Sequence, residues 1–335
     1  MGPPAVTATG LAPTAPAPLA GPALSVAIAG LGTAVPGGRL TNADLAATMD
    51  TSDEWIVERT GIRERRIAAP GETSGSLAVE AGAAALRSAG TTPESVDLLV
   101  VATATPDQAL PHTGAFVGEE LGLACGSFDL AAACAGFVYG LVVGASLLHA
   151  GMGRVLVIGS DTFTRTVEPG DRATAVLFGD GAGAAVLTPS TGGAELLAWD
   201  LGCDGSAAGL LEIPPGTPWL RMAGQEVFRR AVRVAVDSGA AGLARAGLTS
   251  DDVDWYVPHQ ANLRIIEAAR RRLGVPPERT LVNVDRYGNT SAASVPLALS
   301  EAVDDGRIAD GDLVLAQGFG AGMTWASVVL RWGST

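Results

Sequence analysis

Apolar and polar positions along the chain follow two patterns, one typical of buried strands and one typical of helices. The first ordered segment begins near Leu24, where LSVAIAGLGTAVP joins a short apolar run to a Gly/Pro loop and predicts a buried strand. From there to the end of the chain, helix and strand patterns follow one another in turn. This alternation predicts an α/β protein with a largely parallel sheet.

Two segments of the chain resemble each other, which indicates an internal repeat. ALRSAGTTPESVDLLVVATAT and GLARAGLTSDDVDWYVPHQAN each contain the end of a helix, an acidic turn that ends in Val-Asp, and an apolar strand. Aligning Asp97 with Asp254 gives an offset of 254 − 97 = 157 residues. At this offset the strand VLVIG falls on DLVLA, and Cys134 falls on position 291, beside Asn289. Agreement at several places predicts two homologous halves packed about a pseudo-twofold axis.

The repeat predicts how the chain is divided and where its chemistry lies. We expect one half over residues 24–192 and the other over residues 193–335. The loops that hold Cys134 and Asn289 then occupy equivalent places, and His259 stands at the end of a strand. Ligands of parallel α/β sheets bind beyond the carboxyl ends of the strands, so the axis could bring these three residues together there.

The composition supports a large folded core and excludes several classes of protein. Of 335 residues, 47% are hydrophobic and 17% are charged, which is typical of a globular chain and not of a disordered one. The net charge of -13 argues against nucleic acid as a partner, because phosphate binding rests on a basic surface. No segment approaches about twenty uninterrupted apolar residues, so we expect no membrane span.

The N-terminus and the cysteines indicate the compartment. Residues 1–23 are rich in Pro and Ala and lack the basic segment of a signal peptide, so we interpret them as a disordered tail. The three Cys and three His are too few and too scattered for a disulfide framework or a metal site. The reducing cytoplasm is the natural compartment for such a chain.

Cys134 is the first candidate for chemistry. A strand through Phe128–Leu130 leads through small residues into Cys134 and then into an apolar helix that ends near His149. A thiol at this turn faces the positive end of the helix dipole, which favours the thiolate. The alternative is a buried structural cysteine. We interpret Cys125 and Cys203, which lack such a setting, as structural.

His259 and Asn289 are candidates for the stabilisation of negative charge. A neutral imidazole at His259 and the amide NH₂ of Asn289 could each donate a hydrogen bond to a developing oxyanion. The alternatives are a core histidine and a turn residue. Cysteine proteases use similar residue types, but their sequence signatures are missing. The Gly-rich segments GDGAGAAV and GFGAG lack a Walker pattern, so we interpret them as sites of tight backbone packing.

Six segments of the chain closely resemble β-ketoacyl-acyl-carrier-protein synthase III, from about Leu24 to Trp332. They are TSDEWIVERTGIRERR, DLAAACAGF, LFGDGAGAAVL, VPHQANLRII, GNTSAASVPLAL and GFGAGMTWAS. The resemblance implies the thiolase fold, in which two similar halves form five layers, α/β/α/β/α, usually in a homodimer. It also implies that acyl-CoA is a substrate and that the enzyme needs no cofactor.

The resemblance assigns a catalytic role to each of the three candidates. Cys134 accepts an acyl group from acyl-CoA, and malonyl-acyl-carrier-protein then binds. His259 and Asn289 stabilise the enolate that forms as CO₂ leaves, and the enolate carbon attacks the acyl group on Cys134. The backbone N–H groups of Cys134 and Ala321 form the oxyanion site, although many relatives have Gly where Ala321 stands. The product is a 3-oxoacyl-carrier-protein, the first intermediate of fatty-acid or polyketide synthesis.

The resemblance also implies where the substrates bind. Trp55 and Arg172 would hold the adenine of CoA between them, Arg59 and Gly224 would line its tunnel, and Leu110 would close the acyl pocket of the partner subunit. Carrier-protein contacts are implied for the segment after His259, with Arg264 as its docking cation. The residues of this segment are Gln260, Ala261, Asn262, Leu263 and Arg264. Two further Arg clusters, Arg229, Arg230 and Arg233 on one segment and Arg270–Arg272 on another, are additional docking candidates.

Related chemistries fit the sequence less well. A biosynthetic thiolase needs a second Cys in the last Gly-rich loop, and no Cys follows Cys203. Elongating synthases of this fold use two His, whereas Asn289 stands at the position of the second. A non-enzymatic subunit would be expected to lack Cys134. An acyltransferase that delivers its acyl group to an alcohol or amine without decarboxylation remains an alternative.

Overall fold

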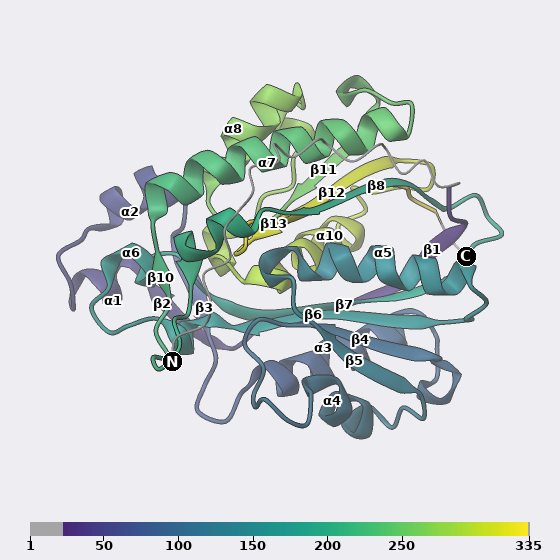
Figure 1. The fold of residues 1–335 in the computed structure, drawn as a ribbon, viewed down its shortest axis with the longest axis horizontal. Coiled ribbons are helices and arrows are strands. Elements are labelled where there is room, and N and C mark those ends of the chain that lie inside the picture. Colours follow the sequence, from purple (N-terminus) through teal and green to yellow (C-terminus); the bar gives the residue numbers. More distant parts are fainter. Residues whose placement is uncertain (1–22, 334–335) are drawn as a thin grey trace, which may run out of the picture.

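A computed structural model describes residues 23–333 of the 335-residue chain. The predicted tail, residues 1–23, lies outside the described residues except for its last position. The described part contains two large sheets, which lie roughly parallel to each other with helices between and outside them (Figure 1).

The first sheet has five strands in the order β1-β7-β6-β4-β5. β4 pairs in parallel with β5 and β6, whereas β7 is antiparallel to both β6 and β1. β6 is buried along its whole length, which explains why it begins with an uninterrupted apolar run. The strands are β1 (Val26–Ala34), β4 (Leu98–Ala102), β5 (Gly126–Leu130), β6 (Val155–Thr162) and β7 (Asp180–Pro189).

The second sheet has four strands in the order β11-β12-β13-β8. Only β11 and β12 are parallel, while β13 is antiparallel to both of its neighbours. Both sheets are therefore mixed, and the prediction of a largely parallel sheet is wrong. The loop between β12 and β13 is too short for a parallel crossover, which needs a dozen or more residues. The strands are β8 (Glu195–Cys203), β11 (Trp255–Pro258), β12 (Leu313–Gly320) and β13 (Thr324–Arg331).

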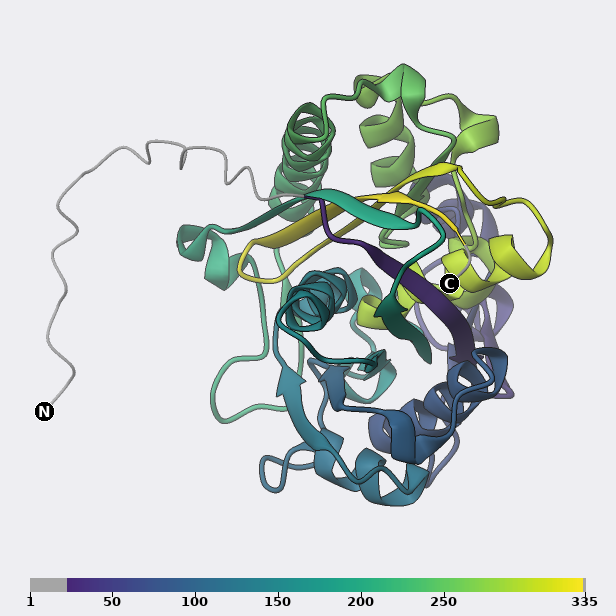
Figure 2. The same cartoon turned by 90° about the vertical axis from the view of Figure 1, so that its right-hand side faces the viewer.

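Helices fill the space between the sheets and cover their outer faces, which gives five layers (Figures 1 and 2). α5 (Gly136–His149) and α10 (Ser294–Asp304) lie between the sheets. α5 is therefore apolar on nearly all sides, whereas α8 on the surface buries one stripe. The layers confirm the predicted thiolase-like arrangement of two halves. The outer helices are α3 (Ser74–Ser88) and α4 (Thr113–Leu121) on the first sheet, and α7 (Gly224–Arg245) and α8 (Leu263–Leu273) on the second.

Shorter elements complete the described chain, and most of them gather at one end of the layers (Figure 1). β2 and β3 form one small antiparallel sheet, and β9 and β10 form another. These elements are β2 (Gly38–Thr41), α1 (Asn42–Ala46), α2 (Asp53–Thr60), β3 (Glu64–Ile67), α6 (Arg172–Ala175), β9 (Leu211–Glu212), β10 (Arg221–Met222) and α9 (Val284–Tyr287).

The internal repeat is visible in the structure, but its offset changes along the chain. β4 and β11 begin 255 − 98 = 157 residues apart, whereas β6 and β12 begin 313 − 155 = 158 residues apart. The 3₁₀ turns η2 (Ala133–Ala135) and η7 (Ser291–Ala293), which precede α5 and α10, also begin 291 − 133 = 158 residues apart. The counterpart of Cys134 is therefore Ala292 and not residue 291. The chain leaves the first sheet at Pro189, and its division between residues 192 and 193 stays a prediction.

Candidate functional site

One cavity of about 570 Å³ brings the three predicted catalytic residues together. Its walls include Cys134 from the turn before α5, His259 from the end of β11, and Asn289 from the loop before α10. Cys134 belongs to the first half of the fold, whereas His259 and Asn289 belong to the second. The cavity therefore depends on the packing of one half against the other.

Cys134 is 5% exposed and lies in η2, directly before α5 begins. Burial raises the pKa of its thiol from the ordinary value of 9.0 to about 12; the Ser291 hydroxyl opposes this rise and the charge of Asp161 adds to it. A helix N-terminus stabilises an anion by at most about 2 kcal/mol, and one pKa unit corresponds to about 1.36 kcal/mol. The dipole favours the thiolate, as expected, but burial outweighs it, so Cys134 is a thiol in the resting protein.

Ser291, which the sequence analysis did not single out, contacts the sulfur. Its fully buried hydroxyl donates to Cys134 Sγ at 3.2 Å. Ser291 begins η7 with a φ of 52°, and Ala133 begins η2 with a φ of 46°, so the two turns share an unusual left-handed start. The repeat was the signal that could have found it, because it places the turn of Ser291 and the turn of Cys134 at equivalent positions of the two halves.

His259 is 1% exposed and is held by both its backbone and its ring. Its backbone N–H donates to the carbonyl of Gln317 at 2.7 Å, and the edge of the Phe319 ring packs on the imidazole with 5.2 Å between centroids. Nδ1 lies 2.6 Å from Ser294 Oγ, which also accepts the backbone N–H of Gln260 at 3.3 Å. When the Ser294 hydroxyl donates to Nδ1, the ring proton lies on Nε2.

The charge state of His259 follows from its burial. Burial lowers the pKa of the imidazole from 6.5 to about 3, so the ring is neutral near neutral pH. A neutral ring with Nε2–H is a hydrogen-bond donor to an anion in the cavity, and it adds no full charge to the site.

Asn289 is held by its backbone and oriented by Ser291. Its N–H donates to the carbonyl of Leu177 at 2.8 Å, and its carbonyl accepts the N–H of Gly179 at 2.9 Å. Its side-chain Oδ1 accepts the N–H of Ser291 at 2.9 Å. Because Oδ1 is engaged, the NH₂ group is the part of the side chain that can donate to a ligand in the cavity.

The end of β12 packs directly against the Cys134 turn. A Cβ atom on Gly320 would lie 2.7 Å from the backbone nitrogen of Cys134, so only glycine permits this approach. Ala321 follows Gly320 and lies in the wall of a second cavity together with Cys134. Cys134 and Ala321, whose backbone N–H groups are predicted to form the oxyanion site, thus line one cavity from different halves.

The second cavity has a volume of about 210 Å³ and is lined mainly by apolar side chains. Cys134 belongs to the walls of both cavities and therefore lies where they meet. Leu110 is 86% exposed and lies outside both cavities of its own chain; its predicted place is the pocket of a partner subunit. The sequence analysis missed most of the lining of the small cavity, which is formed by Ala104, Ala133, Phe163, Phe178, Leu211, Glu212, Ile213 and Leu220.

Trp55, in α2, is contacted by two guanidinium groups in the wall of the large cavity. Arg172 lies 4.7 Å and Arg59 4.9 Å from the centre of its ring, within the range of cation–π attraction. Arg172 also donates to the carbonyl of Asp50 at 2.6 Å. The predicted adenine slot between Trp55 and Arg172 is therefore closed in this structure. Gly224, at the start of α7, lines the same cavity.

Gln260 is the one residue of the predicted docking segment that the structure contradicts. It is 1% exposed, its NH₂ group donates to the carbonyls of Pro258 and Leu281, and its Oε1 accepts the backbone N–H groups of Asn283 and Val284. A buried amide that is fully engaged in this way cannot contact a docked protein. Gln260 holds the loop before α9 in place.

The rest of the segment is more accessible. Ala261 and Leu263 are half-buried, and Asn262 caps α8 by accepting the N–H of Arg264 at 2.8 Å. The Arg264 side chain is exposed and lies over the ring of Phe228, 5.6 Å from its centre. Within the described chain, Arg264 has no acidic partner.

The two predicted Arg clusters are mostly neutralised by neighbouring acids. Arg229, Arg230 and Arg233 all form ion pairs with acidic side chains, as do Arg270 and Arg271. For Arg272 no ion pair is found among the described residues. Arg264, which lines the large cavity, therefore offers a more available positive charge than these clusters.

Two further features of residues 23–333 bear on function. They contain no group of three or more His, Cys, Asp or Glu side chains that could hold a metal ion. No helix in this range is long and apolar enough to cross a membrane.

Family models and known proteins resemble this chain closely. The model described as 3-oxoacyl-[acyl-carrier-protein] synthase III matches residues 128–205, and the model of its C-terminal part matches residues 243–332. The β-ketoacyl-[acyl-carrier-protein] synthase III of Roseiflexus sp. (strain RS-1) is 49% identical over 322 residues, which cover 91% of this chain and 98% of that protein.

Solved structures agree with these matches. The 3-oxoacyl-[acyl-carrier-protein] synthase III of Aquifex aeolicus VF5 superposes with a TM-score of 0.90 at 43% identity and covers 92% of this chain and 100% of its own. The priming β-ketosynthase of the R1128 polyketide pathway superposes with a TM-score of 0.85 at 38% identity and covers 96% and 100%. At such identity over nearly the whole described chain, the resemblance found in the sequence is confirmed: the chain belongs to the β-ketoacyl-[acyl-carrier-protein] synthase III family.

Proposed function

We propose that this chain condenses a starter acyl-CoA with malonyl-acyl-carrier-protein, releases CO₂, and thereby initiates fatty-acid or polyketide synthesis. Membership of the family makes it an acyltransferase of the condensing type. The observation that carries the proposal for this chain is the position of Cys134. It lies where a large cavity lined by His259 and Asn289 meets a small apolar one. A thiol that takes an acyl group from one substrate and passes it to another is expected at such a junction.

In the first half-reaction, the Cys134 thiol attacks the thioester carbon of acyl-CoA. A bond forms between Cys134 Sγ and the acyl carbon, the bond to the CoA sulfur breaks, and CoA leaves as a thiol with the proton that Cys134 gives up. The N–H groups of Cys134 and Ala321 donate to the oxyanion of the tetrahedral intermediate. The small cavity receives the acyl chain, whose burial in apolar surroundings stabilises the intermediate.

In the second half-reaction, the malonyl end of malonyl-acyl-carrier-protein enters the large cavity. The bond to the carboxylate breaks, CO₂ leaves, and the electron pair moves into the thioester as an enolate. His259 Nε2–H and the Asn289 amide donate to the enolate oxygen. The enolate carbon then attacks the acyl carbon on Cys134, the bond from that carbon to Cys134 Sγ breaks, and the departing thiolate takes a proton from water. This proposal keeps both donors neutral, as the burial of His259 requires.

The experiment that tests this function compares two acceptors. We expect the purified protein, given acyl-CoA and malonyl-acyl-carrier-protein, to release one CO₂ for each 3-oxoacyl-carrier-protein formed. The alternative enzyme would transfer the acyl group to an alcohol or amine without CO₂ release. Transfer of this kind, with no CO₂ from malonyl-acyl-carrier-protein, would overturn the proposal.

CoA would enter the large cavity past Trp55. Arg172 covers the Trp55 ring in this structure, so an adenine can lie between them only if the guanidinium moves outward. The guanidinium would then contact the adenine in place of the Trp55 ring. Arg59 already lies near the same ring, and Gly224 leaves room at the start of α7. We assign these four residues to CoA binding.

Arg264 is the proposed docking cation for the carrier protein. Acyl carrier proteins are acidic and this chain has a net charge of -13, so docking needs a local positive charge. We expect Arg264→Glu to weaken the use of malonyl-acyl-carrier-protein by about tenfold or more in KM, while acylation of Cys134 by free acyl-CoA is spared. Steady-state kinetics and intact-protein mass spectrometry measure the two half-reactions separately.

The matched control for this prediction is Arg87→Glu. Arg87 is also an exposed helical Arg, but it lies in the last turn of α3, on the far side of the molecule from α8 (Figure 1). It receives the same charge reversal and should leave both half-reactions unchanged. Equal loss of both half-reactions in Arg264→Glu would point to a folding defect and contradict the docking role.

Leu110 is proposed to close the acyl pocket of a partner subunit in a homodimer. Its side chain is 86% exposed and contributes to neither cavity of its own chain, so it is free to be covered by a second copy. Three free thiols are compatible with the reducing cytoplasm that we propose as its location.

Starter choice should follow the size of residue 110. Members of the family that prefer short straight primers often have Phe there, and Leu leaves more room. Burying one more methylene contributes about 0.8 kcal/mol, and about 1.4 kcal/mol is a factor of ten, so a chain longer by one or two carbons should gain severalfold to tenfold. We expect branched or longer acyl-CoAs to match or exceed acetyl-CoA in kcat/KM, and Leu110→Phe to reverse the order. A strong acetyl preference unchanged by Leu110→Phe would contradict the assignment.

A further inference from the structure

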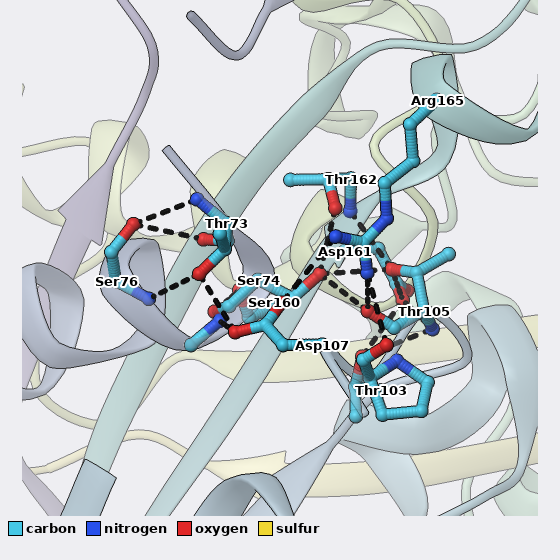
Figure 3. Close-up of polar contacts among 12 residues, drawn as sticks. Thr73, Ser74, Ser76, Thr103, Thr105, Asp107, Ser160, Asp161, Thr162 and Arg165 are labelled. Atoms are coloured by element: carbon cyan, nitrogen blue, oxygen red, sulfur yellow. Dashed lines mark hydrogen bonds and ion pairs between the residues drawn. The ribbon is translucent and has the colours of Figure 1, made fainter. Parts of the chain in front are cut away.

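Asp161 is a buried carboxylate that the proposed chemistry does not use. It lies near the end of β6 and is 0% exposed, and no ion pair with it is found within residues 23–333. Its Oδ1 accepts from the Thr103 hydroxyl at 3.1 Å, the Ala104 N–H at 2.8 Å, and the N–H and hydroxyl of Thr105 at 3.1 and 2.9 Å. Figure 3 shows the carboxylate among these side chains of the loop after β4.

The loop after β4 also forms hydrogen bonds with residues other than Asp161. The Thr105 hydroxyl accepts the N–H of Thr162 at 2.9 Å and contacts Ser74 at 3.0 Å, and the Arg165 guanidinium donates to the Thr105 carbonyl (Figure 3). Asp161 is therefore anchored to the first half through its Oδ1 by a well-ordered set of donors. A buried carboxylate without a cation needs such donors to be tolerated at all.

The other oxygen of Asp161 reaches across to the second half of the fold. Its Oδ2 accepts the backbone N–H of Ala292 at 3.1 Å, in the turn η7. Ala292 is the counterpart of Cys134 in the internal repeat, since 134 + 158 = 292. The N–H group of Ala292 is thus the counterpart of the N–H group that Cys134 presents beside Gly320.

The two halves therefore treat equivalent backbone groups differently. In the first half, the Cys134 N–H lies at the junction of two cavities, where an oxyanion of the substrate can bind. In the second half, the equivalent N–H is permanently occupied by an anion supplied by the protein itself, the carboxylate of Asp161. The duplicated site is filled, and it fixes the turn η7 in place of binding a ligand.

The turn that Asp161 holds carries two contacts of the active site. Ser291 donates its hydroxyl to Cys134 Sγ at 3.2 Å and its N–H to Asn289 Oδ1 at 2.9 Å. Its φ of 52° is costly for a residue with a side chain and persists only where neighbouring contacts hold it. Burial raises the pKa of Asp161, and the N–H groups of Ala104 and Ala292 are among the donors that oppose this rise.

We propose that Asp161 is a positioning residue of the active site: it pins the Ser291–Ala292 turn and thereby places the Ser291 hydroxyl at Cys134 and orients the Asn289 amide. The proposal rests on the proposed function for what it predicts about CO₂ release. What it predicts about the reactivity of Cys134 is independent of any substrate.

Asp161→Asn is the sharpest variant, because the two carboxylate oxygens have unequal partners. The amide oxygen of Asn should face the four donors of the β4 loop, which leaves the NH₂ group opposite the N–H of Ala292. Two donors then face each other, so the link to η7 is lost while the link to the first half remains.

We expect this substitution, made in protein that also carries Cys134→Ala, to lower kcat for CO₂ release from malonyl-acyl-carrier-protein by about tenfold to hundredfold, the usual cost of a misplaced catalytic group. KM should change little, because the docking surface is untouched.

The matched control is Asp180→Asn. Asp180 is also fully buried in the first sheet and accepts only from Ala68 and Thr164, so it tests the loss of a buried carboxylate without the link to η7. Equal kcat in the two variants, at matched thermal stability, would overturn the proposal.

A double-mutant cycle on alkylation of Cys134 by iodoacetamide tests the same role without substrate. Ser291→Ala removes the hydroxyl that lowers the pKa of the thiol, so alkylation at pH 8 should slow severalfold. If Asp161 holds that hydroxyl at the sulfur, Ser291→Ala should change the rate less than about twofold when Asp161→Asn is already present. The same slowing in both backgrounds would refute the positioning role.

These two measurements also separate a failure of the inference from a failure of the proposed function. If Cys134→Ala protein with intact Asp161 releases no CO₂, the function is at fault, and the alkylation cycle still decides on Asp161. Ser291→Ala keeps the backbone hydrogen bonds of η7, so this variant can be used for the alkylation test if Asp161→Asn does not fold. An alkylation profile of Ser291→Ala identical to that of the parent protein would then overturn the proposal.

Discussion

Replacing Cys134 by alanine is expected to abolish acyl transfer from acyl-CoA and to leave decarboxylation of malonyl-acyl-carrier-protein measurable. The loss should be complete because the variant has no atom that can carry the acyl group at the junction of the two cavities. Decarboxylation should persist because the donors of His259 and Asn289 remain in place. Intact-protein mass spectrometry after addition of acyl-CoA should show one acyl adduct on the parent protein and none on the variant.

The chain offers two matched controls for this experiment. Cys203 is exposed and Cys125 is half-buried, and neither lines the cavities. Cys203→Ala and Cys125→Ala should therefore retain the single adduct and the condensing activity. An adduct that survives on Cys134→Ala would place the nucleophile elsewhere.

Replacing His259 by alanine should affect the two half-reactions in the opposite way to Cys134→Ala: decarboxylation should be lost and acylation of Cys134 retained. Loss of one oxyanion donor typically lowers kcat by about 10²–10³, so we expect decarboxylation and condensation to fall by this factor. Acylation of Cys134 should continue, because its oxyanion is assigned to backbone N–H groups. Retained acylation also serves as an internal measure of correct folding in the variant.

The pH dependence of the parent enzyme provides an independent check on His259. Burial lowers the pKa of His259 to about 3, so no protonation of this ring should reduce condensation as the pH falls from 8 to 5. A loss of activity with a midpoint near the ordinary histidine value of about 6.5 that persists in both His149→Ala and His112→Ala would contradict a neutral, buried His259.

The sequence alone was sufficient for the family, the reaction class and the two-half fold. The strand and helix patterns, the Cys134 turn and the segment around His259 are local in the chain, and local patterns can be read without a structure. The repeat added long-range information, because similar segments predict similar and symmetrically placed elements. It also placed the loop of Cys134 and the loop of Asn289 at equivalent positions of the two halves.

The sequence pattern was less informative about details that depend on exact register. A single inserted residue changes the offset from 157 to 158 and makes Ala292 the counterpart of Cys134. The direction of each strand relative to its neighbours could not be predicted either. A fully buried strand is an apolar run whether its neighbours are parallel or antiparallel to it. The mixed sheets follow instead from the lengths and paths of the connections.

Tertiary structure alone decided the environment of each site residue. Gln260 sits in an exposed-looking polar motif, yet it is buried because the loop before α9 closes over it. The thiol of Cys134 has a raised pKa because the second half covers it, and the weak helix dipole cannot compensate. Asp161 and Ala292 are 131 positions apart, and only the packing of one half on the other joins them. Burial and long-range hydrogen bonds arise from residues distant in the chain, so no local pattern contains them.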